Sequence, residues 1–381
     1  MVRLLRGFIF FLLLCAICRA QSSVDTLMPG ATDGSKPAAK EVAQPVTTDA
    51  TPDAKASEPS PARKIRLTAI ESVVSKTETA TGFSQLSCDG DGNLYLGPGA
   101  NGDAIRKINS KAELVTFFKA EANPDIEIYG AGLYAVTPDG ELYQWVGTKT
   151  EITRYVLVFK PDGSYKSNIK LDPGFAWMPA SIAVFPNGNL LMTGQRLERK
   201  SKQFILPFTG IFRSDGKLLK SVALEENEKI PEAPSIEDMP SPMPVYSNRA
   251  VAWGQVQPAN DGNIYIMRWG SPAGFYAVSP GGEVVKRFTV DPGDPGYQPM
   301  QMHIAGSRIA LLFRHPDTHD YMMKIVDLDG KELAAYEIPQ KEQPKDDPLA
   351  VFACYSLRPE RFTFLGNNKD FKIKLMQAEA H

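Results

Sequence analysis

The sequence predicts an all-β fold, a six-bladed β-propeller of four-stranded antiparallel blades whose last blade is closed by an N-terminal strand. The first observation is a recurring glycine turn, usually Asp-Gly or Asn-Gly, between short runs of β-branched and aromatic residues. Such dipeptides adopt the positive φ angles of tight hairpins, so the flanking runs are expected to pair as antiparallel strands. The second is the spacing of the turns, which gives two hairpins in about 45 residues, as a four-stranded blade needs.

The blades are assigned from this spacing. The first hairpin turns of successive blades are marked by glycines, namely Gly92, Gly140, Gly188, Gly262 and Gly306. Five blades are therefore predicted, at 83–120, 126–171, 178–224, 254–290 and 298–338. The longest step between turns contains an insertion at 225–253.

The third observation is that the C-terminal part offers only three strands, within 352–376. The segment 65–73 is predicted to supply the fourth. Pairing the two ends of the chain closes the ring and removes an exposed strand edge, which would invite aggregation. Seven blades and a pair of separate β-sandwiches are the alternatives, because even strand spacing alone does not distinguish them. The propeller domain is thus expected at 64–377.

The first 20 residues have the layout of a secretory signal peptide. They contain Arg3 and Arg6, an apolar stretch at 8–16, and Ala20 before the expected cleavage point. The apolar stretch is too short to span a bilayer, and a retained anchor is the alternative. Residues 21–63 are rich in Pro, Ala, Ser and Thr, so they are predicted to be a disordered tether. We expect an exported protein, in the periplasm or the extracellular space.

The charge of the chain argues against one class of partner. The formal net charge is -2, and loss of residues 1–20 removes three arginines and no acid, which lowers it to -5. A mildly acidic chain lacks the concentrated basic surface that binding to nucleic acid needs. No other run is long and apolar enough for a membrane helix. The mature chain is expected to be a monomer without a membrane span.

Three turn segments share a longer pattern, apolar-Asp-x-Asp-Gly-Asn-apolar-Tyr-apolar or a close variant of it. They lie at 88–96, 182–192 and 258–266. In this pattern the chain resembles the NHL-type six-bladed propellers, over residues 65–377. The resemblance implies the fold and no activity.

The candidate binding residues are expected on the face opposite the glycine turns, where the long loops gather and binding residues concentrate. Trp177 and Trp253 precede predicted inner strands, and Tyr297 holds the matching place in the fifth blade. Aromatic side chains around a channel mouth can stack on a sugar or peptide, and the alternative is packing between blades. Arg249, in the insertion, and His303, on an inner strand, complete this set.

A second set of candidates is a metal site. His315, Asp317 and His319 alternate along one segment, so in an extended conformation their side chains point the same way. They could then hold a divalent metal, although a site normally needs a fourth group, and a solvated turn is the alternative. Similar six-bladed propellers include calcium-dependent lactonases and zinc lyases. The Glu-Gly-Pro segment of the lactonases is not found in this sequence. The zinc lyases use several inward histidines, and this chain has only four histidines in all.

Two cysteines remain after the signal peptide, Cys88 and Cys354. An exported chain with two cysteines is a candidate for one disulfide. Aligning the strands on their Leu-Gly pairs, 96–97 and 365–366, puts Cys354 opposite Gln85, three residues out of register with Cys88. An odd offset points two strand side chains to opposite faces, so this alignment disfavours the bridge.

The predicted function is a non-catalytic binding or scaffolding propeller that recognises a protein, peptide or glycan on its loop-rich face. The chain contains no Gly-x-Ser-x-Gly nucleophile motif, no His-Glu-x-x-His and no phosphate-cradling glycine loop. The alternative is a metal-dependent hydrolase or lyase, lactonase-like, with its site at the channel mouth. No cofactor is expected beyond the divalent metal of that alternative.

Overall fold

The structure is a computed structural model that describes eleven stretches of the chain. They are 63–64, 66–70, 85–97, 104–109, 113–148, 154–198, 203–225, 254–338, 349–357, 360–367 and 373–379. The predicted signal peptide, the tether up to residue 62, Arg249 and Trp253 lie outside the described residues. The chain divides into two units, Met1–Pro61 and Ala62–His381, and the described stretches all belong to the second. None of them contains a helix long and apolar enough to cross a membrane.

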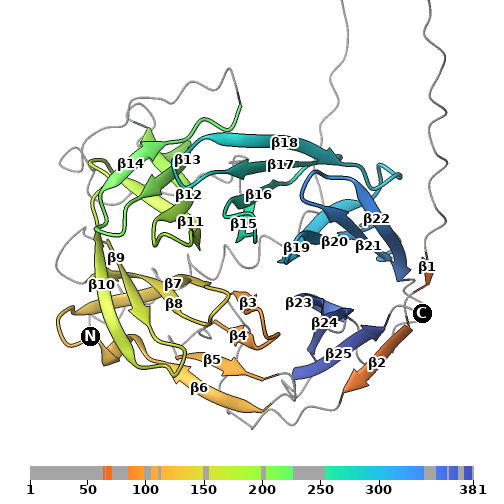
Figure 1. Cartoon of the computed structure of the whole chain (residues 1–381), viewed down its shortest axis with the longest axis horizontal. Coiled ribbons are helices and arrows are strands. Elements are labelled where there is room, and N and C mark those ends of the chain that lie inside the picture. The colour runs from red at the N-terminus through yellow and green to blue at the C-terminus, as the bar shows by residue number, and fades with distance from the viewer. Residues whose placement is uncertain are drawn as a thin grey trace, which may run out of the picture. The chain divides into compact units, whose positions relative to one another are not determined.

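These residues form an all-β propeller of four-stranded antiparallel blades, each built from consecutive strands (Figure 1). Blade 1 consists of β3 (Leu86–Cys88), β4 (Leu94–Leu96), β5 (Ile105–Ile108) and β6 (Leu114–Phe118), followed by the short 3-10 helix η1 (Ala120–Ala122). Blade 2 consists of β7 (Ile128–Val136), β8 (Leu142–Thr148), β9 (Arg154–Phe159) and β10 (Tyr165–Leu171). Blade 3 consists of β11 (Trp177–Val184), β12 (Leu190–Glu198), β13 (Gln203–Phe212) and β14 (Leu218–Ser221).

The second half of the ring follows the same plan until the chain ends. Blade 4 consists of β15 (Gly254–Pro258), β16 (Ile264–Arg268), β17 (Ala273–Val278) and β18 (Val284–Val290). Blade 5 consists of β19 (Gln298–Ala305), β20 (Arg308–Arg314), β21 (Tyr321–Asp327) and β22 (Glu332–Ile338). A closing sheet combines β23 (Leu349–Leu357), β24 (Glu360–Asn367) and β25 (Ile373–Glu379) with the N-terminal β2 (Arg66–Ile70).

One strand of each sheet lies innermost, next to the central axis (Figure 1). These inner strands contact one another in the order β3, β7, β11, β15, β19 and β23, and β23 contacts β3 again. The ring of sheets is therefore closed. We call the contact between two neighbouring sheets a seam.

The two ends of the chain meet in the closing sheet. β2 pairs antiparallel with β25, with Arg66 opposite Glu379 and Ile70 opposite Leu375. This confirms the pairing that the sequence predicts for 65–73. A strand that the sequence does not predict, β1 (Arg63–Lys64), pairs in parallel with β22 at the edge of blade 5. The N-terminal segment is thus hydrogen-bonded to the edges of two neighbouring sheets.

Glycines in the left-handed conformation occupy the predicted hairpin turns, for two different reasons. Gly262 has φ +83°, and nothing lies within 4 Å of the position that a Cβ atom would take, so the φ angle alone requires glycine. Gly216 has φ +85°, and its Cβ position lies 1.8 Å from the carbonyl oxygen of Lys170 in blade 2. Here glycine also permits the close approach of blades 2 and 3.

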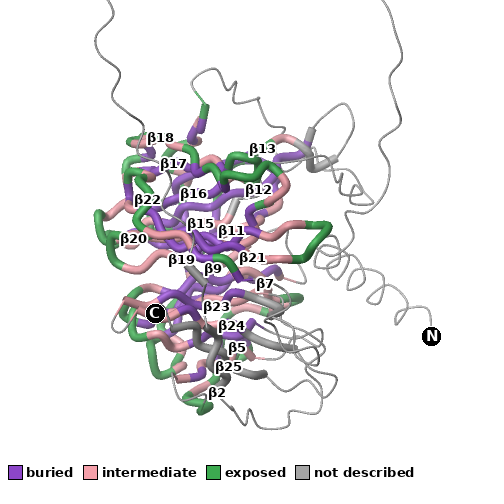
Figure 2. Tube along the Cα trace, turned by 90° about the vertical axis from the view of Figure 1, so that its right-hand side faces the viewer, coloured by how far each residue is buried: buried purple, intermediate pink, exposed green. Residues whose placement is uncertain are grey.

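Apolar clusters fill the seams between neighbouring sheets. Successive side chains of a strand point to opposite faces, so each blade contributes to two clusters. Ile264 and Ile266 of blade 4 pack against blade 3, whereas Tyr265 and Met267 pack against blade 5. Figure 2 shows the buried residues along the interior strands and the exposed residues at the turns. Each blade therefore depends on both neighbours for its core.

Glutamine side chains add polar links between inner strands, which share no main-chain ladder. Gln85, just before β3, accepts from the backbone N–H of Tyr134 on β7 at 3.1 Å and donates to its carbonyl at 2.7 Å. Gln257 on β15 bonds in the same way to the main chain of β19, at 2.8 and 2.9 Å. Gln255 and Gln301 each accept from a backbone N–H of the next inner strand.

A disulfide between Cys88 and Cys354 joins β3 to β23 across the last seam, with the two Cα atoms 5.7 Å apart. The register argument that disfavours this bridge is wrong, because neighbouring sheets meet through opposite faces. Cys88 lies on the face of blade 1 that meets the closing sheet, and Cys354 lies on the face of the closing sheet that meets blade 1. Side chains on opposite faces of their own sheets therefore meet across the seam.

Loss of the disulfide is expected to lower the free energy of unfolding by about 4 kcal/mol, because the bridge spans 266 residues and restricts the unfolded chain. Urea unfolding of the Cys88→Ser, Cys354→Ser and double variants measures this loss. All three variants should lose the same amount, since removing either sulfur breaks the bond. A midpoint that does not move when the parent protein is reduced would contradict the expectation.

The Gly216→Ala variant is expected to be less stable than its matched control, Gly262→Ala. Both substitutions place a side chain at a positive φ angle, which costs about 1 kcal/mol. At Gly216 the new methyl group must also displace the backbone of Lys170, and overpacking of this kind adds about 2 kcal/mol. Urea unfolding of both variants in one buffer gives the difference. An equal loss of unfolding free energy in the two variants would mean that the Lys170 carbonyl does not lie so close to Gly216.

Candidate functional site

A cleft of about 290 Å³ opens between blades 2 and 3. One wall is the connection from β10 to β11, and the rim includes the first residue of β9 and the turn between β13 and β14. The charged lining residues are Arg154, Lys170, Asp172, Asp215 and Lys217. The other lining residues are Leu171, Pro173, Phe175, Ala176 and Trp177.

Local hydrogen bonds hold the connecting wall in place. The Asp172 carboxylate accepts from the backbone N–H of Gly174 at 3.2 Å, which is an Asx turn. The backbone N–H of Asp172 donates to the carbonyl of Gly216 at 2.9 Å, and its carbonyl accepts from the N–H of Leu218 at 3.4 Å. Asp172 thereby forms a parallel bridge with Lys217. The wall is therefore fixed to blade 3 before β11 begins.

Aromatic side chains form the floor of the cleft. Trp177, a predicted ligand-stacking residue, is only 5% exposed. Its ring stacks on Phe212 with the centroids 5.4 Å apart. Phe208 packs edge-on against Trp177 and Phe175, at 5.3 and 5.1 Å. Trp177 therefore packs between the blades, as the alternative interpretation holds, and it also borders the cleft.

Arg196 on β12 lies against the same aromatic rings. Its guanidinium carbon is 4.3 Å from the ring centroid of Phe175 and 4.5 Å from that of Phe208, and Nη2 donates to Ser221 Oγ at 2.8 Å. Burial lowers the pKa of this guanidinium, yet an arginine starts so far above neutrality that it stays charged. Sequence reasoning does not place Arg196 at this site, because the rings that enclose it come from other strands and the preceding connection.

Two lysines of the cleft form no ion pair within the described stretches, whereas the carboxylate of Asp215 does. The Asp215 carboxylate accepts from the backbone N–H of Lys217 at 3.1 Å and from Arg213 at 2.6 Å, and these bonds lower its pKa. The ammonium groups of Lys170 and Lys217 have no ion-pair partner within the described stretches. The cleft therefore favours a ligand that brings a negative charge.

The segment that carries the candidate metal ligands is not extended, and an extended conformation is the condition for their side chains to point the same way. It forms a turn, in which the N–H of His319 donates to the carbonyl of His315 at 2.9 Å. Nδ1 of His315 faces the backbone N–H groups of Asp317 and Thr318, each at 3.3 Å. Tyr297 packs edge-on against the His315 ring, at 5.3 Å between centroids. The described residues contain no group of three or more side chains that could share one metal ion.

His303 lies in the seam between blade 5 and the closing sheet and is 5% exposed. Its Nε2 is 3.0 Å from the carbonyl oxygen of Phe352, and its Nδ1 is 3.4 Å from Nε2 of Gln257. Burial lowers the pKa of this imidazole to about 4. The ring is therefore neutral at pH 7 and contributes to the polar links between inner strands.

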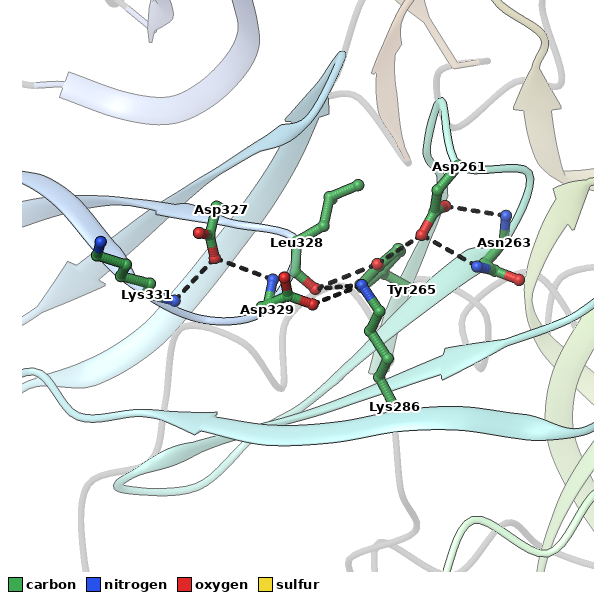
Figure 3. A network of polar contacts seen from close by, with 8 residues as sticks. All are labelled: Asp261, Asn263, Tyr265, Lys286, Asp327, Leu328, Asp329 and Lys331. Carbon is green, nitrogen blue, oxygen red and sulfur yellow. Dashed lines mark hydrogen bonds and ion pairs between the residues drawn. The ribbon is translucent and has the colours of Figure 1, made fainter.

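A polar cluster on the turn face joins blades 4 and 5 (Figure 3). Asp261 accepts from the backbone N–H of Asn263 at 3.1 Å and from the hydroxyl of Tyr265 at 2.8 Å. Burial acts to raise the pKa of Asp261, but these hydrogen bonds outweigh it and the pKa is lowered. Lys286 reaches Asp329 in the next turn, at 2.6 Å. These contacts join a turn of blade 4 to a turn of blade 5.

Fold and site together define the chain as a β-propeller of four-stranded blades with a charged, aromatic-floored cleft between two blades. No protein-family model matches the chain. A search of curated proteins finds no match either.

Among solved structures, many propellers are similar to this chain. One is the PQQ-bound aldose sugar dehydrogenase from Streptomyces coelicolor, with 12% identity over 84% of this chain and 99% of that chain and a TM-score of 0.43. A second is a protein of unknown function from Bacteroides caccae, with 13% identity over 68% and 82% of the two chains and a TM-score of 0.41. A third is YCF48 bound to D1 peptide, with 12% identity over 83% and 97% and a TM-score of 0.39. The similarity is one of fold.

Protonation of His303 is expected to destabilise the protein as the pH falls from 6.5 towards 4. The folded pKa is about 4, whereas an unfolded histidine titrates near 6.5, so within this window only the unfolded chain binds the proton. Up to ~3 kcal/mol of unfolding free energy is lost through this group. The stability is fully present above the unfolded pKa.

The His303→Gln variant provides the reference, because glutamine keeps a donor for the carbonyl of Phe352 but does not titrate. Urea unfolding of both proteins at neutral pH and near pH 4.5 measures the effect. The stability of the parent relative to the variant should fall at the lower pH. Parallel pH profiles for the two proteins would contradict the buried, neutral imidazole.

Proposed function

We propose that this chain is an exported, non-catalytic binding propeller that captures a ligand at the cleft between blades 2 and 3. The observation that carries the proposal is a pair of ammonium groups beside an aromatic floor, at Lys170 and Lys217, which form no ion pair with any described residue. Cavities that bind ligands combine apolar walls with a few convergent polar groups. The ligand class is a protein, a peptide or a glycan. The chain works as a monomer in this proposal.

The wider proposal concerns the ring and its compartment. The closing sheet serves as the sixth blade of an NHL-type propeller, with residues 64–377 as the domain and 21–63 as its tether. Export is supported by the basic and apolar N-terminal residues. It is also supported by the disulfide between Cys88 and Cys354, since such bonds persist in oxidising compartments.

We choose this cleft rather than the centre of the ring because the other candidate binding residues already contact groups of the protein itself. His303 is bonded on both ring nitrogens within a seam, and Tyr297 packs on His315. Both are engaged by the protein itself. Lys170 and Lys217 are exposed and keep their hydrogen-bonding capacity for a ligand.

Filling the cleft is expected to abolish ligand capture. Pro173, a half-buried lining residue, is replaced in the Pro173→Trp variant, whose larger side chain occupies the cavity. Pro280, a half-buried proline in a turn of blade 4, gives the matched control Pro280→Trp. The full chain and both variants are applied to peptide and glycan arrays.

The parent and the control should bind the same spots, and the filled variant should bind them at least about tenfold more weakly, as expected when an anchor pocket is lost. Thermal unfolding checks that the filled variant is folded. The proposal fails if the parent binds no array member, or if the filled variant binds as the parent does.

A further inference from the structure

We infer that the cleft recognises an acidic peptide segment, in which a carboxylate side chain lies between Lys170 and Lys217 and a neighbouring apolar side chain contacts the aromatic floor. This inference rests on the proposed function and names the chemistry of its ligand. Two independent features carry it, namely an uncompensated pair of cations and a small apolar cavity beside them.

The two lysines are brought together by the contact between blades 2 and 3. Lys170 is on the outer strand of blade 2, and its carbonyl oxygen touches Gly216. Lys217 follows that glycine directly and pairs with Asp172 through the main chain. Both side chains are exposed on the cleft rim. Two like charges at one rim repel each other, and an anion between them relieves the repulsion.

The carboxylates of the cleft do not provide that anion. Asp215 forms an ion pair with Arg213 and caps the backbone of Lys217. Asp172 accepts from the backbone of Gly174. Neither lies within ion-pair distance of an ammonium group of the cleft, although both line it. Within the described stretches no carboxylate forms an ion pair with Lys170 or Lys217, so a ligand can supply the complementary charge.

The same strands show what a lysine does where a partner exists. Lys166, also on β10, forms an ion pair with Glu141. Lys220, on β14 just after Lys217, forms one with Glu283 at 3.1 Å. On the same strand, therefore, Lys166 has an ion-pair partner and Lys170 has none among the described residues. Lys166 and Lys220 also provide matched controls, because their side chains do not line the cleft.

The cavity limits the size of the ligand. Its volume of about 290 Å³ is at the lower end of ligand sites and accommodates one or two side chains. Leu171, Phe175 and Trp177 are buried lining residues, so the inner part is apolar. An acidic residue next to an apolar one supplies both contacts. A neutral sugar leaves the lysines unpaired, and a long polyanion is repelled by a chain whose net charge is negative.

The test uses three blocked peptides and the full chain, by calorimetric titration at low ionic strength. The first probe is acetyl-Ala-Glu-Leu-Glu-Ala-amide, the second replaces both Glu by Gln, and the third replaces Leu by Ser. The first should bind at least about tenfold more tightly than the second, because the second has no carboxylate to place between the lysines. Loss of the leucine should weaken binding about fivefold. Binding should weaken as salt is added.

The variants assign the contacts. Lys170→Gln and Lys217→Gln should each weaken binding of the first probe about threefold, and the double variant about tenfold, as for exposed charge pairs. Lys166→Gln and Lys220→Gln should leave it unchanged. The inference is overturned if the neutral peptide binds equally well, if the double variant binds as the parent does, or if inorganic phosphate displaces the probe at the probe's own concentration.

The outcomes separate this inference from the proposed function. If the acidic probe fails, but array binding is still lost in Pro173→Trp and kept in Pro280→Trp, the cleft binds a ligand of other chemistry and only the inference fails. If array binding also survives in Pro173→Trp, the proposed function fails with it.

Discussion

The ring depends on side chains that reach from one inner strand to the main chain of the next. Neighbouring sheets share no ladder of main-chain bonds, and buried backbone groups without partners are costly. Gln85, Gln257 and Gln301 supply partners at three seams. Because each glutamine bonds to a particular backbone group, it also fixes the position of one blade along the next. At the last seam the link is covalent, through Cys88 and Cys354.

The seam between blades 2 and 3 is built in another way. Neither β7 nor β11 contains a glutamine, and the seam is filled by aromatic rings from both blades, Tyr143, Trp177 and Phe208 among them. Stacked rings pack well against one another but do not close the outer end of the seam, where the main chain passes from Lys170 to Phe175. The cleft therefore lies at a seam that is filled by aromatic rings and has no glutamine link between its inner strands.

Local chemistry explains which parts of the fold could be predicted from sequence. Gly262 and Gly216 mark hairpins because the φ angle of a turn depends on the turn residues themselves. The pairing of β2 with β25 could be predicted because the C-terminal part of the sequence offers only three of the four strands that a blade needs. The bridge between Cys88 and Cys354 depends on which faces of two sheets meet, and the sequence of a single strand does not determine this. Lys170 and Lys217 belong to different predicted blades, so whether they lie close together depends on how closely two sheets approach. The role of Trp177 could not be predicted, because an aromatic residue just before an inner strand suits both packing between blades and stacking on a ligand.

The N-terminal attachment gives the domain a mechanical order. Tension applied at residue 63 first peels β1 and β2 from the edges of blade 5 and the closing sheet, where main-chain pairing resists it. The load then reaches β3, whose Cys88 is covalently joined to β23. Beyond that point the pull is carried by the sulfur atoms, so blades 1 to 5 stay folded while the leading strands detach. A propeller whose first strands detach in this order extends under load without losing the cleft between blades 2 and 3.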